Sequence, residues 1–244
     1  MKPEAPLDLN LSGERFAVTY SMWGSEEDVR ASAQALTIEE TVEYPADVLP
    51  DGDIRDQLTG EILSITHKED NHWQMVMSYA VETTSFELLQ FLNVVYGNVS
   101  MITNVRAEAF TLPESFLKRF KGPRLGRQGL RERLHAPQRA LTATATKPMG
   151  LSSQAFARMA RDYALGGLDI VKDDHGLSDQ TWAPFRERVK LCADAVHEAN
   201  AKTGGHCLYF PSLTAPAEQV LERAQYAKEV GADGLLVIPS LIGW

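Results

Sequence analysis

Apolar and polar residues alternate in four segments of the first half of the chain, and this period of two is typical of β-strands that bury one face. Two segments with helical spacing interrupt them. One predicted helix follows the turn and N-cap signal Gly24-Ser25 and runs to about Leu36, and a second has Ser85 as its expected N-cap and ends near Gly97-Asn98. The four predicted strands cover residues 15–23, 60–66, 73–79 and 105–112, of which the middle two are expected to form an antiparallel hairpin. The pattern predicts an α+β first domain over residues 1–121.

The pattern changes at Gly122-Pro123, after which predicted strands and helices alternate regularly. A basic, helix-like stretch at residues 127–134 comes first. Strands are then predicted at 140–146, 168–172, 207–211 and 234–238, and helices at 152–165, 184–203 and 216–230. Short connections of this kind require parallel strands, as in a (β/α) barrel or an open doubly wound sheet. The glycine-containing turns at Gly166-Gly167 and Gly231 favour the barrel.

Residues 122–244 hold four predicted strands, whereas a closed barrel of this kind has eight strands and about 250 residues of its own. The last predicted strand would be a long apolar edge that must be covered. We therefore expect the chain to be truncated or split midway through the barrel.

The chain has 244 residues, 44% of them hydrophobic, and a formal net charge of −9. This length suffices for one large or two modest domains, and the lack of a basic excess argues against nucleic acid and favours a small-molecule partner. Cys192 and Cys207 fall on a predicted buried helix and strand, so neither a disulfide framework nor a zinc site is expected. Because neither an export signal nor a membrane-spanning stretch is evident, we expect a cytoplasmic protein without a membrane partner.

Polar residues directly follow the first two strands of the predicted barrel, where such folds carry their chemistry. Lys147 follows the first strand, and Lys172, Asp173, Asp174 and His175 stand at the end of the second. Hard divalent cations prefer oxygen ligands and accept some nitrogen. The run is therefore a candidate metal site, and a solvated charged loop is the alternative interpretation.

Four segments resemble consecutive segments of the RuBisCO large-chain family in order and spacing. They read FKGP at residues 120–123, KPMGLS at 147–152, GGLDIVKDD at 166–174 and FRERVKLCA at 185–193. Gly97-Asn98 and Thr203-Gly204 extend the resemblance over essentially the whole chain. The resemblance implies a ferredoxin-like α+β domain at residues 1–121, followed at residues 122–244 by the first half, strands one to four, of a (β/α)8 TIM barrel. It also implies a homodimer in which the first domain of one subunit closes the active site of the other.

The resemblance further implies roles for individual residues. Lys172 matches the lysine that reacts with CO2 to form a carbamate, which converts a cation into an oxygen ligand for Mg²⁺. Asp174 matches the aspartate ligand of that metal, and Lys147 matches a first-strand lysine that acts as an acid or base. Asn98 and Glu39 match first-domain residues that reach the substrate in the neighbouring active site.

Three departures from the family pattern bear on activity. His175 stands where carboxylating members place a third metal ligand, a glutamate, and a neutral nitrogen in that position weakens Mg²⁺ binding. The loop at Met149-Gly150 is one residue shorter than the family's and lacks its second lysine, and Pro239-Ser240 replaces the His-Asp that follows the fourth strand. These losses argue against CO2 fixation on ribulose bisphosphate and favour the RuBisCO-like group.

We therefore expect a RuBisCO-like enolase or isomerase acting on a phosphorylated keto sugar of the methionine-salvage type. In such a reaction a metal polarises the ketone oxygen, a base removes the neighbouring C–H proton, and the metal stabilises the enediolate. The base is either the carbamate of Lys172 or the amine of Lys147. The alternatives are decarboxylation or carboxyl transfer on a phosphorylated 3-oxo sugar acid, true ribulose-bisphosphate carboxylation, and an incomplete fragment that needs a second chain.

Overall fold

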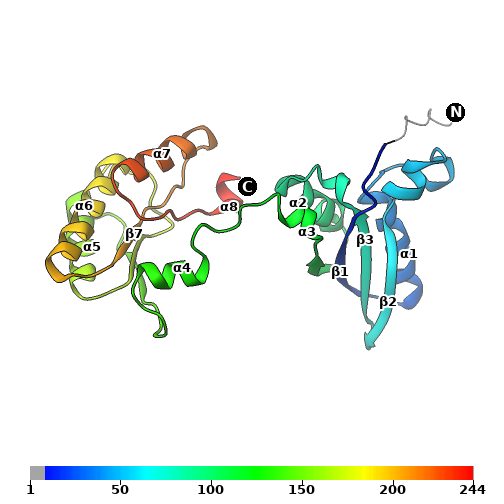
Figure 1. The fold of residues 1–244 in the computed structure, drawn as a ribbon, viewed down its shortest axis with the longest axis horizontal. Helices are drawn as coiled ribbons and strands as arrows, with labels where there is room; N and C mark the ends of the chain where they lie inside the picture. The colour runs from blue at the N-terminus through cyan, green and yellow to red at the C-terminus, as the bar shows by residue number, and fades with distance from the viewer. Residues whose placement is uncertain (1–8, 244) are drawn as a thin grey trace. The chain divides into compact units, whose positions relative to one another are not determined.

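The computed structural model describes residues 9–243, which form a mixed α/β fold in two compact units that divide between Gly122 and Pro123. In Figure 1 the colour runs from blue to green through the first unit and from green to red through the second. No helix within the described residues combines the length and the apolar composition that crossing a membrane requires. A ferredoxin-like first domain and a half barrel in the second remain predictions.

The first unit contains a four-stranded antiparallel sheet with the order β2-β3-β1-β4. Its strands are β1 (Arg15–Trp23), β2 (Glu61–Glu69), β3 (His72–Ala80) and β4 (Val105–Thr111). Alternate side chains of β1 and β3 enter one core, where Tyr20 and Met77 are fully buried, as the period of two predicts. The predicted hairpin forms between β2 and β3, with its turn at Asp70-Asn71.

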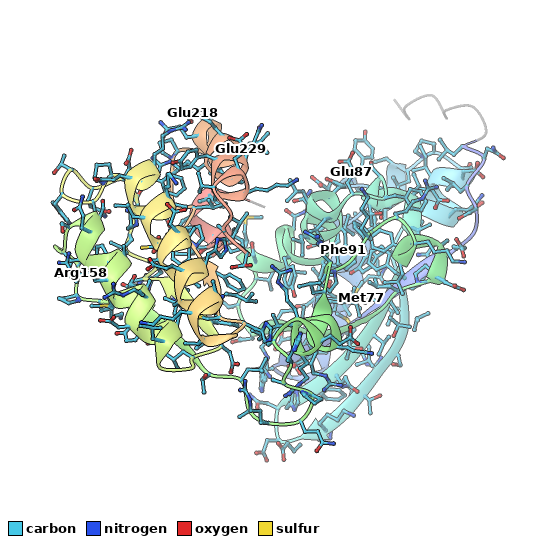
Figure 2. The ribbon with its side chains drawn as sticks, turned by 60° about the vertical axis from the view of Figure 1, so that its left-hand side comes forward. Met77, Glu87, Phe91, Arg158, Glu218 and Glu229 are labelled. Carbon is cyan, nitrogen blue, oxygen red and sulfur yellow. The ribbon has the colours of Figure 1, made fainter. Side chains whose placement is uncertain are left out.

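Helices contribute to the core on the same face of this sheet. The longest is α1 (Glu26–Glu39), which begins at Ser25, whose hydroxyl accepts a hydrogen bond from the Asp28 N–H, as the N-cap signal predicts. Figure 2 shows Phe91 of a second helix and Met77 of β3 inside this unit. The other helical segments are α2 (Leu88–Tyr96), α3 (Glu114–Leu117), η1 (Ala46–Val48), η2 (Ile54–Leu58), η3 (Val81–Thr84) and η4 (Asn98–Met101).

The predicted N-cap of the second helix is wrong. Ser85 adopts a left-handed φ of 51° and donates its N–H to the carbonyl of Glu82, so that it ends η3 rather than beginning α2. The chain winds into this short turn directly after β3, and α2 begins only at Leu88. A serine before a segment with helical spacing can be the N-cap of that helix or the last residue of a preceding turn, because its side chain forms local hydrogen bonds in both settings.

The second unit contains three parallel strands in the order β5-β6-β7. The strands are β5 (Ala143–Thr146), β6 (Ile170–Asp173) and β7 (Leu208–Phe210). They alternate with α5 (Ser153–Leu165), α6 (Phe185–Thr203) and α7 (Ala217–Glu229), in the predicted order, while α4 (Gly126–Arg133) precedes them and α8 (Pro239–Ile242) follows.

The two faces of this parallel sheet are covered differently. Val171 of β6 belongs to the core that α5, α6 and α7 form on one face. Ile170, one residue earlier, belongs to a separate cluster with Leu134 at the end of α4. Because side chains alternate along a strand, Lys172 shares the face of Ile170 and Asp173 shares the face of Val171. The strand thus sends two neighbouring charged residues to opposite faces.

The strand predicted at residues 234–238 is wrong. Of these residues Leu236 alone pairs, in a single parallel bridge with Ser212, although the Asp233 N–H also donates to the Tyr209 carbonyl at 3.1 Å. A ladder needs a partner of matching length, and β7 has three residues. Leu235 is 41% exposed, so extending the pairing would gain little burial.

Candidate active site

Two strand ends of the second unit bring three predicted site residues together. Lys147 directly follows β5 and Asp174 directly follows β6. The Nζ atom of Lys147 lies 3.2 Å from Oδ1 of Asp174, and Nδ1 of His175 lies 3.5 Å from the same oxygen. Because β5 and β6 run parallel, their carboxyl ends share one edge of the sheet, and residues far apart in the sequence meet there.

Lys172 occupies β6 itself and is half-buried. Its ammonium donates a hydrogen bond to the carbonyl oxygen of Asp173 at 3.2 Å. In the part of the chain that the structure describes, no hydrogen bond or ion pair joins Lys172 to Asp174 or His175. The structure therefore brings two of the three predicted metal ligands into contact and leaves the third outside that contact.

The donor types of this cluster suit a divalent cation only in part. Asp174 offers a carboxylate oxygen and His175 an imidazole nitrogen, both of which bind such ions. Among residues 9–243, no group of three His, Cys, Asp or Glu side chains is placed to hold a metal ion. Lys172 would have to supply the third ligand, and an ammonium has no lone pair to offer until it is converted to a carbamate.

The charge of Lys147 controls the ionisation of Asp174. Partial burial acts to raise the pKa of Asp174, but the hydrogen bond and the positive charge of Lys147, together with His175, outweigh it and hold that pKa below its ordinary value. Asp174 is therefore an anion at neutral pH, and Lys147 faces it as a cation. This pair can hold an amine in one position and offer a proton to a bound molecule.

A buried network holds the end of β6 on its opposite face. Asp173 and Arg188 are fully buried, and Arg188 Nε lies 3.2 Å from Asp173 Oδ2. The hydroxyl of Tyr209 donates to Asp173 Oδ1 at 2.8 Å, and the N–H of Ser212 donates to Oδ2 at 3.2 Å. Burial raises the pKa of Asp173, against the opposing effect of these three donors. Donors from α6, from β7 and from the loop after β7 thus converge on one carboxylate of β6, next to Lys172 and Asp174.

Sequence reasoning missed Arg188, although a signal for it exists. Arg188 lies on the buried stripe of α6 together with Phe185, Val189 and Cys192. A charged side chain in such a stripe is buried and needs partners. Arg188 also donates to the carbonyl of Ser178 at 2.8 Å, which fastens the loop after His175 to α6.

The remaining two predicted residues lie in the first unit. Nδ2 of Asn98, at the start of η4, donates to the backbone carbonyl of Glu39 at 2.5 Å. Both residues line a cavity of about 370 Å³. Glu40, which the sequence did not single out, is buried beside them and accepts a hydrogen bond from the Val99 N–H at 2.5 Å.

The two cysteines offer no reactive thiolate. Both are free and buried. Burial raises the pKa of Cys192 to about 12 and that of Cys207 to about 11. Because the thiolate is the nucleophile and the metal ligand, neither residue contributes to the candidate site at neutral pH.

The chain is similar to known proteins of the RuBisCO large-chain family. The family model described as ribulose bisphosphate carboxylase large chain, catalytic domain, matches residues 126–244. The chain is 36% identical over 230 residues to ribulose bisphosphate carboxylase-like protein 1 of Rhodopseudomonas palustris, covering 94% of this chain and 62% of that protein. It is 35% identical over 231 residues to the 5-methylthioribulose-1-phosphate isomerase of Rhodospirillum rubrum, again covering 94% of this chain and 62% of that protein.

A solved structure shares the fold. The crystal structure of a Rubisco-like protein from Rhodopseudomonas palustris matches with a TM-score of 0.87 at 35% sequence identity, covering 94% of this chain and 64% of that one. The chain spans about 62% of the length of the two curated relatives.

Proposed function

Because this chain belongs to the RuBisCO large-chain family, we propose that it acts as a RuBisCO-like isomerase or enolase on a phosphorylated keto sugar of the methionine-salvage type. The relative from Rhodospirillum rubrum is named for isomerisation of 5-methylthioribulose 1-phosphate, which makes that compound the first substrate to test. The observation that carries the proposal is the Lys147–Asp174 pair, 3.2 Å apart at neighbouring strand ends.

Lys147 is the proposed acid. In the pair it is an ammonium, which has protons to donate and no lone pair to accept one. Its side chain is 62% exposed while that of Asp174 is 20% exposed, so the amine is open to a bound molecule and the carboxylate anchors it. Isomerising a keto sugar moves a proton between neighbouring carbons; a carbamate on Lys172 would accept that proton as the base, while Lys147 as a positioned acid stabilises the negative oxygen that develops.

Asp174, His175 and a CO2-derived carbamate on Lys172 would hold Mg²⁺ at this edge, where the bound ion would polarise the substrate ketone. His175 is the weakest of these ligands for Mg²⁺, because its nitrogen is neutral. The buried Asp173 lies between Lys172 and Asp174 in the chain and keeps their backbone fixed through Arg188. We therefore assign Asp173 and Arg188 a positioning role.

We also propose a homodimer in which Glu39 and Asn98 of one subunit bind the phosphorylated substrate held by the other. The proposal is supported by the cavity of about 370 Å³ that both residues line, which suits a small polar ligand. The hydrogen bond between them holds the two residues together before substrate arrives.

The test measures proton exchange on the substrate. The full chain is incubated with 5-methylthioribulose 1-phosphate in D2O, with and without Mg²⁺ and bicarbonate, and deuterium incorporation is followed by proton NMR. We expect exchange in the wild type, and Lys147→Ala should slow it by about 10²–10⁴-fold, the usual contribution of a general acid or base. Lys228→Ala removes an exposed lysine from α7 and should leave the rate unchanged.

Two results would contradict this function: no exchange under any of these conditions, or exchange that is unaffected by Lys147→Ala. Formation of phosphoglycerate from ribulose bisphosphate and CO2 would instead identify a carboxylase. That outcome would show that His175 can replace the glutamate of the carboxylating members.

A further inference from the structure

Glu40 is a buried carboxylate at the end of α1, with 6% of its surface exposed. It continues the buried stripe of that helix, in which Val29, Ala33 and Leu36 precede it at helical spacing. Burying a charge is costly unless a partner compensates for it. Within residues 9–243, however, no lysine, arginine or histidine forms an ion pair with Glu40. Simple packing therefore does not explain a glutamate at this position.

Two hydrogen bonds join η4 to the end of α1, and η4 supplies the donor of both. Oε1 of Glu40 accepts the backbone N–H of Val99 at 2.5 Å, and Nδ2 of Asn98 donates to the backbone carbonyl of Glu39 at 2.5 Å. Two consecutive residues of each segment take part, and each segment contributes one side chain. This clamp, formed by residues 39–40 and 98–99, fixes the distance between the two predicted substrate-binding residues.

The turn that carries Asn98 is tightly packed on its other side. A Cβ placed on Gly97 would lie 2.5 Å from the backbone carbonyl oxygen of Asn93, so the chain leaves α2 in a space that only glycine fits. The Gly97 N–H donates to that same carbonyl at 2.7 Å. Gly97 is held against α2, so the position of Asn98, the next residue, depends on the clamp.

The surroundings of Glu40 disfavour its negative charge. The ionisable groups that face it are Glu39 and Glu43 on its own segment, Tyr20 on β1 and Tyr79 on β3. None of them is a cation, and burial raises the pKa of both tyrosines, which are neutral near pH 7. Burial likewise raises the pKa of Glu40, to about 7, against the hydrogen bonds from Val99 and Asn98 and with help from Glu43 and Glu39.

We propose that Glu40 is a positioning residue whose carboxylate fastens the Asn98 turn to the end of α1 and so presents Glu39 and Asn98 together to the substrate. A carboxylate accepts a hydrogen bond about twice as strongly as a neutral carboxyl oxygen. Protonation therefore weakens the bond to Val99 and loosens the turn. The first unit then binds substrate less well in mild acid, because the turn that carries Asn98 is held less firmly. This inference rests on the proposed function for the roles of Glu39 and Asn98.

The decisive experiment observes the clamp directly. In the full, isotope-labelled chain, the backbone amide of Val99 and the side-chain amide of Asn98 are followed by NMR across neutral pH. In the wild type both signals should shift with a midpoint near 7. Glu40→Gln retains an oxygen acceptor but does not titrate, so this shift should vanish. Glu27→Gln, which removes the same charge from the exposed first turn of α1, should leave it unchanged. A wild-type Val99 amide that does not titrate, or one that titrates equally in Glu40→Gln, overturns the proposal.

A kinetic measurement separates this inference from the proposed function. For 5-methylthioribulose 1-phosphate, the wild-type KM should rise severalfold as pH falls through 7, with kcat changing less than KM. In Glu40→Gln the KM should be independent of pH and close to the acidic limit of the wild type. If the Val99 signal titrates as expected and the chain is inactive, the clamp stands and the proposed function fails. If the chain is active and its KM does not respond to Glu40→Gln, the positioning role fails.

Discussion

Two buried carboxylates, Asp173 of the second unit and Glu40 of the first, lie next to candidate residues and are partnered in opposite ways. Asp173 receives a guanidinium, a phenol and a backbone amide. Glu40 accepts hydrogen bonds from the backbone of Val99 and Asn98, and the ionisable groups that face it are acids and phenols. Burial raises the pKa of both carboxylates, but Arg188 favours the charged form of Asp173, whereas the ionisable groups that face Glu40 disfavour its charge.

The largest expected effect comes from removing the cation beside Asp173. Arg188→Ala leaves a buried carboxylate without its partner, which costs about 3–5 kcal/mol of unfolding free energy. Urea unfolding at neutral pH, followed by circular dichroism, measures the loss. Arg161→Ala, which breaks an exposed pair with Asp162, should change stability by less than about 0.5 kcal/mol. If the two variants lose similar amounts of unfolding free energy, the charge of Asp173 is not structural.

The next effect tests the opposite behaviour of Glu40. Its folded-state pKa of about 7 lies above the ordinary 4.5, so the folded chain holds this proton more tightly than the unfolded chain. Its contribution to stability is therefore full below 4.5 and is lost as pH rises toward 7. Glu40→Gln avoids that loss, and above pH 7 it should be more stable than the wild type by about 2–3 kcal/mol. Thermal unfolding of both proteins at several pH values measures the difference, and equal stabilities at every pH would contradict the raised pKa.

A smaller effect isolates one donor of the Asp173 network. Tyr209→Phe keeps the buried ring and removes the hydroxyl that donates to the Asp173 carboxylate, which should cost about 1.5 kcal/mol. Tyr226→Phe is the matched control, because its hydroxyl donates to the Arg186 carbonyl at the surface and should contribute less. Urea midpoints of the two variants make the comparison. A Tyr209→Phe protein as stable as Tyr226→Phe would assign the stability of the network to Arg188 alone.

The smallest expected effect on stability comes from Asp174, which is adjacent to the buried Asp173. Asp174→Asn removes the partner of Lys147, whose side chain is 62% exposed, and the unfolding free energy should change by less than about 1 kcal/mol. Asp173→Asn, one residue earlier, should destabilise far more. The same urea titration measures both variants. Equal losses would mean that Asp174 is as structural as its neighbour, which would weaken its assignment to the candidate active site.

Periodicity predicted most of the fold, because burial of one face imposes it locally. The bounds of β1 at Arg15 and Trp23 follow from strict alternation, and α1 begins at its predicted cap, Ser25. The errors arose where the outcome depends on a neighbour. Ser85 ends η3, a turn whose position depends on the path of the chain after β3. The pairing of residues 234–238 depends on the neighbouring β7, which has three residues, and is limited to the bridge between Leu236 and Ser212.

The candidate site was predictable to a similar degree. The meeting of Lys147 and Asp174 follows from the parallel order of their strands. Asp173 was grouped with Lys172 and Asp174 as part of one polar run, whereas alternation sends it to the opposite face. The partnership of Glu40 with Val99 joins positions 59 residues apart, and no local pattern of one sequence encodes such a pair.

The buried Asp173–Arg188 pair also favours one register of β6 between its neighbouring strands. β6 has four residues and makes few backbone hydrogen bonds. A shift of its register by one residue would therefore lose little backbone hydrogen bonding. Such a slip would turn the Lys172 ammonium toward the helices, against the Arg188 guanidinium, and would carry Asp173 away from it. Two like charges would then be enclosed without a counter-ion, so misaligned chains are penalised by repulsion. A single buried arginine thus helps select the one pairing in which Lys172 faces away from the helices.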